Sequence, residues 1–273
     1  MKSILITGAY GGMGLCAVKR FASLGYTVFA LDICKKGEDI AGVIPVVTDL
    51  TDEESVIRAR NEVLSHTDTL SAVLHFAGMY NLDSLVEMED TAFRKILDVN
   101  LRSAYLVNRL FLPLLKPDSR ILITTSELAI LDPLPFTGIY AVTKAALDKY
   151  AFSLAMELQL LGIRVSVLRA GAVNTGMLGA STAALDKFCE GTSLYTCNAA
   201  RFKSIVERVE ARSVSPERIA EKCAKIIAKR RPRFAYGINR NPLLVLLNLL
   251  PKRVQLFAIK TVLKPPKSTD KNV

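Results

Sequence analysis

The chain has 273 residues, half of them apolar, which is enough for the large core of one α/β domain. Its five cysteines form no CxxC pair and its two histidines are far apart, so no disulfide framework and no metal site are predicted. The net charge of +10 is uneven: residues 201–273 hold 18 Lys/Arg against 5 Asp/Glu, whereas residues 1–200 are slightly acidic. Reduced cysteines are typical of a cytoplasmic protein.

Apolar runs alternate with helical patterns along residues 1–240. Strands are expected at 3–6, 27–31, 43–47, 71–76, 119–125, 163–168 and 233–236. Helices are expected at 12–24, 52–65, 88–115 with a break, 140–161 and 216–230. This alternation predicts the α/β class, with a Rossmann-type doubly wound parallel sheet in a single domain.

The segment 176–214 is too long for an ordinary connection between a strand and a helix. It is partly apolar and follows the carboxyl end of an expected strand, where ligands bind in open α/β sheets. We therefore expect a helical substrate lid. The alternative is a small helical subdomain that only enlarges the core.

A glycine-rich turn follows the first expected strand and opens the first expected helix. Such a turn lets the backbone approach a pyrophosphate at a helix N-terminus. The candidate contacts are Gly8, Gly12, Met13 and Gly14. The spacing fits TGxxxGxG through Gly12 and also TGxxGxxG through Gly11, so it does not choose between the two patterns.

Asp32 ends the second expected strand, at the distance from the glycines where an acid binds an adenosine ribose diol. A carboxylate at this place repels a 2′-phosphate, so NAD is favoured over NADP. Lys35 and Lys36 follow closely and are interpreted as a solvated turn.

Tyr140 and Lys144 are four residues apart on an expected helix and so share one face, with Ser126 upstream. An ammonium beside a phenol favours the tyrosinate, so we expect Lys144 to lower the pKa of Tyr140 and make it an acid or base near neutral pH. The alternative is an amphipathic helix with a surface cation. The glycine turn upstream favours catalysis.

These motifs resemble the short-chain dehydrogenase/reductase family, compact subtype, between about residues 3 and 236. The resemblance implies that Tyr140 is the general acid/base and that Lys144 binds the nicotinamide ribose. It also implies that Ser126 bonds the substrate oxygen and that Asn100 holds a proton-relay water. Further cofactor contacts implied by the resemblance are Asp49, Leu50, Ala77, Gly78, Gly171, Val173 and Thr175.

The chain departs from the family pattern at three places. His75 and Phe76 replace two asparagines, and we interpret His75 as a core or hydrogen-bonded strand residue. Ala170 replaces a proline. Ser126 lies 14 residues before Tyr140, at the long end for the family, so Thr125 is the alternative for the serine role.

The basic tail, residues 241–273, starts with an apolar run over 243–250 that is too short to span a bilayer. Residues 253–264 form an amphipathic pattern. Arg253, Lys260 and Lys264 fall on one side and Phe257 is an exception; the other side holds Val254, Ala258, Ile259, Val262 and Leu263. The tail is predicted either to lie peripherally in a membrane interface or to cover the pocket or a partner subunit.

We therefore expect an NAD-dependent enzyme that interconverts a hydrophobic secondary alcohol and a ketone, with a steroid-, retinoid- or lipid-like substrate. Three alternatives are a non-catalytic dinucleotide-binding sensor or membrane scaffold, an extended-subtype sugar-nucleotide epimerase, and a nucleic-acid binder. The last is disfavoured because few aromatic residues accompany the cations. A homo-oligomer is also expected, with no nucleic acid as partner.

Overall fold

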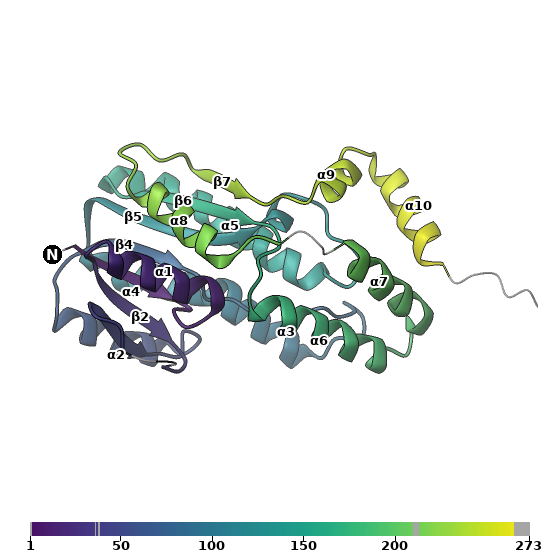
Figure 1. Ribbon diagram of the computed structural model, residues 1–273, viewed down its shortest axis with the longest axis horizontal. Helices are drawn as coiled ribbons and strands as arrows, with labels where there is room; N and C mark the ends of the chain where they lie inside the picture. Colours follow the sequence, from purple (N-terminus) through teal and green to yellow (C-terminus); the bar gives the residue numbers. More distant parts are fainter. Residues whose placement is uncertain (1, 36, 38, 210–212, 265–273) are drawn as a thin grey trace, which may run out of the picture.

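The computed structural model describes residues 2–35, 37, 39–209 and 213–264. For residues 176–182 and 207–209 it describes the backbone and not the side chains. The strands form one parallel sheet in the order β3-β2-β1-β4-β5-β6-β7 (Figure 1). Their bounds are Ser3–Thr7 (β1), Thr27–Asp32 (β2), Val43–Val47 (β3), Leu70–His75 (β4), Leu115–Ser126 (β5), Arg164–Ala170 (β6) and Ala235–Ile238 (β7). The predicted doubly wound α/β fold is confirmed.

Helices cover both faces of the sheet. One face is covered by α1 (Gly12–Ser23) and α8 (Pro216–Ile227). The other face is covered by α2 (Glu53–Leu64), α4 (Ser103–Phe111) and α5 (Gly138–Leu158). Strand residues alternate between the two cores: Leu5 of β1 packs with the second group, whereas its neighbours Ile4 and Ile6 pack with the first.

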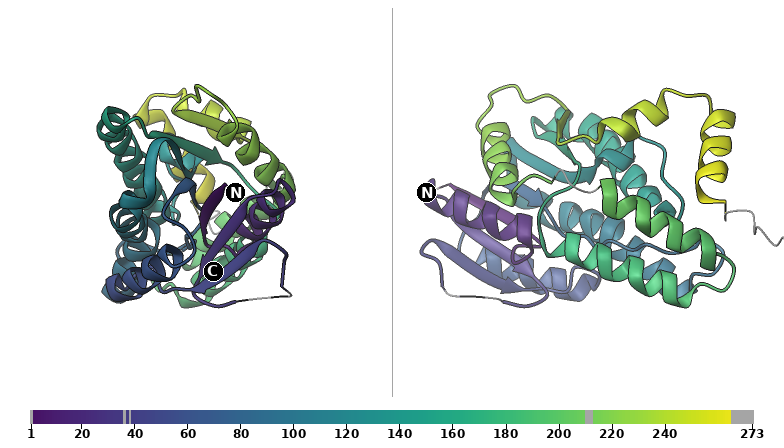
Figure 2. Two further views of the ribbon diagram at one scale, coloured as in Figure 1. Left: turned by 90° about the vertical axis from the view of Figure 1, so that its left-hand side faces the viewer. Right: turned by 45° about the vertical axis from the view of Figure 1, so that its right-hand side comes forward.

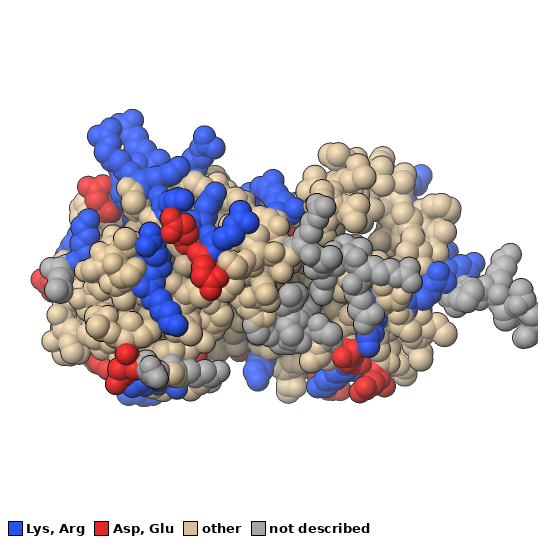
Figure 3. Space-filling view, viewed as in Figure 1, with Lys and Arg blue, Asp and Glu red and all other residues tan. Residues whose placement is uncertain are grey.

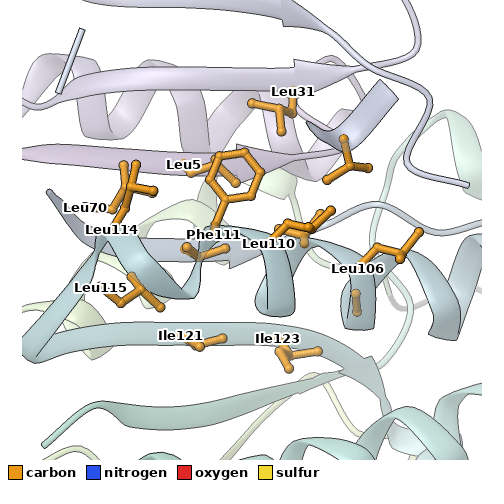
Figure 4. Packing of buried hydrophobic residues seen from close by; sticks show 14 of the residues in the cluster. Leu5, Leu31, Leu70, Leu106, Leu110, Phe111, Leu114, Leu115, Ile121 and Ile123 are labelled. Carbon is orange, nitrogen blue, oxygen red and sulfur yellow. The ribbon is translucent and has the colours of Figure 1, made fainter. Parts of the chain in front are cut away.

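Leucines and a phenylalanine of α4 make the centre of the second core. Leu106, Leu110 and Phe111 point from α4 onto the strands (Figure 4). Phe111 is fully buried, as are Leu5 and Leu70 of the sheet beneath it. Burial of each such side chain stabilises the folded state by about 1.5–3 kcal/mol. This core therefore holds α4 and the sheet together beneath the carboxyl edge, where the candidate site lies.

The broken helix expected at 88–115 consists of α3 (Asp90–Leu97), a π-helical turn at Asp98–Arg102, and α4. Asn100 lies in the middle of that turn and is buried. Single π turns inside α-helices are frequent at functional sites.

His75 is a buried, hydrogen-bonded residue at the end of β4, as predicted. Its Nε2 donates to Asn108 Oδ1 at 2.9 Å, and Asn108 Nδ2 donates to the Tyr150 hydroxyl at 3.2 Å. Burial lowers the pKa of His75 to about 4, so the imidazole is neutral at pH 7.

The expected lid segment forms two helices, α6 (Gly176–Gly191) and α7 (Thr196–Val209). They share a third apolar cluster with Leu82, Phe136 and the tail residue Leu263. The tail forms α9 (Pro242–Asn248) and α10 (Lys252–Leu263), and Figure 2 shows both helices at the lid end of the molecule. Residues 210–212 of the predicted lid and 265–273 of the predicted tail lie outside the described residues.

None of the helices within the described ranges combines the length and the apolar character that crossing a bilayer requires.

Candidate active site

The carboxyl ends of the strands bring most of the predicted cofactor contacts to one edge of the sheet. A cavity of about 610 Å³ opens there between the turn after β1 and the ends of β2 and β4. Among its lining residues are Gly8, Gly12, Met13, Gly14, Asp32, Asp49, Leu50, Ala77, Gly78 and Thr175. Ligands of open α/β sheets bind in crevices of this kind.

Two positions of the glycine turn, Gly8 and Gly12, are packed so closely that they leave no room for a side chain. Gly8 has a φ of +63°, and a Cβ there would lie 2.6 Å from the backbone nitrogen of Ala77. A Cβ on Gly12 would lie 2.6 Å from Thr175 Cβ, whereas one on Gly11 would meet only Gly8 O at 3.3 Å. The close packing therefore falls on Gly12, and the geometry favours the TGxxxGxG pattern.

Asp32 places a fixed carboxylate in the same cavity. Its Oδ2 accepts a hydrogen bond from Tyr10 N and its Oδ1 accepts one from Ile33 N, both at 2.8 Å. Next to it, Asp49 accepts hydrogen bonds from the hydroxyl and the backbone nitrogen of Thr51, which lower the pKa of Asp49. The close-packed glycine turn and the fixed carboxylate of Asp32 in one cavity fit a dinucleotide.

Asn100 fixes the chain that follows β4. Its Oδ1 accepts from Met79 N at 2.7 Å, and its Nδ2 donates to Met79 O and to Thr143 Oγ1, both at 3.0 Å. A Cβ on Gly78 would lie 3.3 Å from both Asn100 Oδ1 and Lys144 Nζ. Asn100 and Lys144 thus meet at Gly78, which is one of the residues that line the cavity.

Ser126 and Tyr140 meet although 14 residues separate them. Ser126 is the last residue of β5, and its hydroxyl hydrogen-bonds the Tyr140 phenol, an interaction that lowers the pKa of Tyr140. Leu128 N donates to Ser126 Oγ at 3.2 Å and fixes the serine rotamer. Lys144 Nζ lies 5.6 Å from the centroid of the Tyr140 ring, on the same face of α5.

The prediction that the pKa of Tyr140 lies below its ordinary value is wrong for the protein without a bound cofactor. Burial raises the pKa of Tyr140 to about 12 and outweighs the hydrogen bond from Ser126. Burial also lowers the pKa of Lys144 to about 8. The Lys144 ammonium, at this distance from the phenol, does not offset the rise in the pKa of Tyr140 that the loss of water around the phenol causes.

Thr125, the alternative to Ser126, lies in a different cluster. Its Oγ1 donates to Asp148 Oδ1 at 3.2 Å, and Asp148 also forms an ion pair with Arg169. The geometry therefore supports Ser126 for the serine role. Asp148 lies one turn after Lys144 on α5. It was not predicted as a site residue, because an Asp on a helix is usually exposed to solvent.

Four of the predicted cofactor contacts are not among the residues that line the cavity: Tyr140, Lys144, Gly171 and Val173. Gly171 N donates to Ile238 O at 3.0 Å, and a Cβ there would lie 1.8 Å from Asn239 O. Val173 forms an isolated parallel bridge with Val214. The turn with Ala170 in place of proline is thus held by β7 and by the segment before α8.

Two more residues at the site were not predicted. Tyr80 lines the cavity, and its ring centroid is 4.9 Å from that of Tyr140. Glu127 follows Ser126, is buried, and accepts a hydrogen bond from Asn241 N at 2.7 Å. Burial raises the pKa of Glu127. The sequence signal that could have found Tyr80 and Glu127 is that each lies within two residues of a predicted site residue, Gly78 and Ser126 respectively.

A family model described as short chain dehydrogenase matches residues 2–186. The chain belongs to this family. The match includes the glycine turn, Asp32, Asn100, Ser126, Tyr140 and Lys144, so this short-chain dehydrogenase is an oxidoreductase by family.

Curated relatives resemble this short-chain dehydrogenase over different lengths. The uncharacterized oxidoreductase YbbO of Escherichia coli K12 is 29% identical over 93% of the chain and 92% of its own length. The 3-ketodihydrosphingosine reductase of Bacteroides thetaiotaomicron is 24% identical over 94% and 96%. Estradiol 17-beta-dehydrogenase 2 of Mus musculus is 31% identical over 65% of the chain and only half of its own length.

Solved structures share the fold of this short-chain dehydrogenase. The 3-ketoacyl-(acyl-carrier-protein) reductase of Brucella melitensis, complexed with NADH, superposes with a TM-score of 0.71 at 24% identity, over 87% of this chain and 96% of that one. A short-chain dehydrogenase family protein from Francisella tularensis gives a TM-score of 0.72 at 20% identity, over 87% and 97%.

Proposed function

We propose that this short-chain dehydrogenase uses NAD(H) to interconvert a hydrophobic secondary alcohol and a ketone. The observation that carries the proposal is the contact of Ser126 with the Tyr140 phenol beside Lys144, near the cavity of about 610 Å³ that the glycine turn lines. A non-catalytic sensor has no need of a phenol held by a hydroxyl donor and a buried amine.

The proton step is assigned to Tyr140. In ketone reduction the Tyr140 hydroxyl donates its proton to the carbonyl oxygen, which Ser126 holds by a hydrogen bond. In alcohol oxidation the tyrosinate accepts the alcohol proton. A pKa of about 12 keeps Tyr140 protonated at neutral pH, so the protein alone is set for the acid role.

The dinucleotide is assigned to the cradle of Gly8, Gly12 and Gly14, with Asp32 on the adenosine ribose. When bound, it supplies or accepts the hydride. Lys144, held against Gly78, is assigned to the nicotinamide ribose. Asp32 is the reason for proposing NAD, because its carboxylate repels a 2′-phosphate on that ribose.

The apolar side chains around the lid support a hydrophobic substrate. Phe136 lies at the centre of an aromatic group, with ring centroids 4.5 Å from Phe188, 5.3 Å from Tyr195 and 5.6 Å from Phe202. Tyr80 joins this apolar cluster to Tyr140. Estradiol and 3-ketodihydrosphingosine, which occur in the names of two relatives, are lipid-like molecules.

A substrate panel tests this proposal. The protein is mixed with NAD⁺ and with secondary alcohols of the sterol, retinoid and long-chain classes, and NADH formation is followed. Each apolar alcohol is paired with a sugar alcohol as a matched polar control. The proposal predicts turnover of at least one apolar alcohol, and turnover of the sugar alcohols alone would contradict it. The homo-oligomer stays a prediction, which sedimentation equilibrium tests.

A further inference from the structure

The tail helices expose large apolar side chains at the lid end of the molecule. Leu249 is 76% exposed and Phe257 is 70% exposed, and no described residue covers either one. Leu243, Leu246 and Leu256 are also more than half exposed. We name these five residues, together with Arg253, Lys260 and Lys264, the α9–α10 surface.

The two sides of α10 follow the predicted pattern, and the structure shows which side packs on the protein. Ile259 and Leu263 turn inward and pack on the lid cluster, and Asn198 Nδ2 donates to Leu263 O at 2.7 Å. Phe257, the exception in the sequence pattern, is therefore on the outside with the cations. Arg253, Phe257, Lys260 and Lys264 follow the spacing i, i+4, i+7 and i+11 and share one side.

All charged residues of the tail segment 241–264 are positive. Residues 241–264 contain four Lys/Arg and no Asp or Glu. Lys252 forms an ion pair with Asp132. Arg253, Lys260 and Lys264 are exposed, and among the described residues none of the three forms an ion pair with an acidic side chain. Figure 3 shows the end formed by α9 and α10 as mostly uncharged surface with Lys and Arg side chains at its outer edge.

We propose that the α9–α10 surface docks the protein on an anionic lipid bilayer. Phe257 and Leu249 enter the boundary between head groups and acyl chains, while Arg253, Lys260 and Lys264 contact the anionic head groups. A short basic helix with exposed apolar side chains is suited to lie in such an interface. Each cation near an anionic leaflet strengthens binding roughly five-fold, an effect that salt screens.

A second copy of this chain fits the same surface less well. A two-fold interface joins identical patches, so the three unpaired cations of one copy would face those of the other. Like charges brought together in a desolvated contact oppose association. An anionic bilayer supplies both the apolar phase and the counter-charge.

The α9–α10 surface is tied to the candidate active site. Asn241, which caps α9, donates its backbone N–H to Glu127, the residue after Ser126. At the other end of α9, Asn248 Oδ1 accepts from Asp132 N at 2.6 Å. Docking would therefore place the lid end beside the lipid. Delivery of substrate from the bilayer rests on the proposed function, whereas docking does not.

Vesicle sedimentation tests the docking. The full chain is mixed with vesicles of phosphatidylcholine alone or with phosphatidylserine added, at low and high salt. We expect binding to the anionic vesicles, weaker binding to the neutral ones, and a fraction that resists salt because of the apolar contacts. Arg253→Glu with Lys260→Glu should lower the partition coefficient on anionic vesicles at least about tenfold. Leu249→Ser with Phe257→Ser should remove the salt-resistant fraction.

Two matched controls separate docking from general charge and hydrophobicity. Arg230→Glu with Arg231→Glu makes the same charge change in the exposed segment between α8 and β7, far from α10 (Figure 1). Leu160→Ser with Leu161→Ser changes exposed leucines between α5 and β6, at the opposite edge of the sheet. The controls should bind vesicles like the wild type, and every variant should bind NADH like it.

Three results would overturn the docking proposal. The first is wild-type protein that stays in the supernatant with anionic vesicles at low salt. The second is a control pair that loses as much vesicle binding as the tail pairs. The third is a dimer that Phe257→Ser dissociates without any vesicle binding. Vesicle binding by a protein that oxidises none of the alcohols would leave docking standing and count against the proposed function.

Discussion

Asp148 of α5 binds the guanidinium of Arg169 of β6 through both of its carboxylate oxygens. The Nε–Oδ1 distance is 2.9 Å and the Nη2–Oδ2 distance is 2.7 Å, and the two side chains are only 16% and 10% exposed. Thr125 of β5 donates to the same carboxylate. The pair therefore joins the helix that carries Tyr140 and Lys144 to the two strands beside it.

Arg169→Met should destabilise the fold by about 3 kcal/mol, because it leaves the Asp148 carboxylate largely buried without its cation. Urea unfolding gives the free energy. The matched control is Arg164→Met, which breaks the ion pair with Asp118, 38% and 80% exposed. That change should cost less than about 1 kcal/mol. Equal losses in the two variants would show that Arg169 does not hold α5.

Asp32→Ser should bring the dissociation constants of NADH and NADPH closer together. The carboxylate that repels the 2′-phosphate is lost, and a change of roughly tenfold in the ratio corresponds to about 1.4 kcal/mol. Fluorescence titration of both cofactors measures it. Asp68→Ser, an exposed change before β4, should leave the ratio unaltered. Equal wild-type affinities for NADH and NADPH would contradict the NAD assignment.

His75 should make the fold sensitive to mild acid. Its pKa in the folded protein is about 4, below the ordinary 6.5, so the unfolded chain binds the proton first. Stability from neutral His75 is complete above about pH 6.5 and decreases by about 3 kcal/mol on going down to pH 4. Unfolding free energies at pH 7 and pH 4 should differ by that much more in the wild type than in His75→Asn. An identical pH dependence in both proteins would refute this cause.

Glu87 should hold the turn between the two lid helices. Its carboxylate accepts hydrogen bonds from Thr192 Oγ1 at 2.6 Å, Ser193 N at 2.9 Å and Leu194 N at 3.0 Å. These bonds lower the pKa of Glu87 to about 2 from its ordinary 4.5. The contact is therefore complete above about pH 4.5 and is lost as the pH falls through about 2.

Glu87→Gln should speed hydrogen exchange of the amides at 193 and 194, because the neutral amide accepts more weakly than the carboxylate. Exchange measured by mass spectrometry at pH 7 checks this. Glu89→Gln, an exposed change two residues away, is the control. Unchanged exchange in Glu87→Gln would mean that other contacts fix the turn.

The sequence predicted the order of the strands along the chain and the parallel sheet, because buried strands are continuous apolar runs in this fold. It also predicted that the helix over 88–115 is broken, and the structure places the break at Asp98–Arg102. Most of the predicted cofactor contacts line one cavity, since each follows a strand whose carboxyl end meets that edge. Gly171 and Val173 do not line it, because their turn is bonded to Ile238 and to residues near Val214.

Other features depend on contacts between distant parts of the chain. Two examples are the ion pair of Asp148 with Arg169 and the hydrogen bond from Asn241 to Glu127. They join segments that are far apart in the chain, and no sequence pattern predicts that these segments lie together. The sign of the pKa shift of Tyr140 depends on how far the fold removes water from the phenol. Periodicity separated the two sides of α10, but it did not state that Leu263 on the apolar side packs on the lid.

Tyr140→Phe tests the central claim most directly, since it removes the proton-transferring oxygen while Lys144 and the glycine cradle remain. General acid–base catalysis contributes about 10²–10⁴-fold, so kcat should fall at least about 100-fold on any substrate that the wild type uses. The dissociation constant of NADH, measured by fluorescence, should stay close to that of the wild type. A variant that keeps near-normal kcat would contradict the assignment of the proton step to Tyr140.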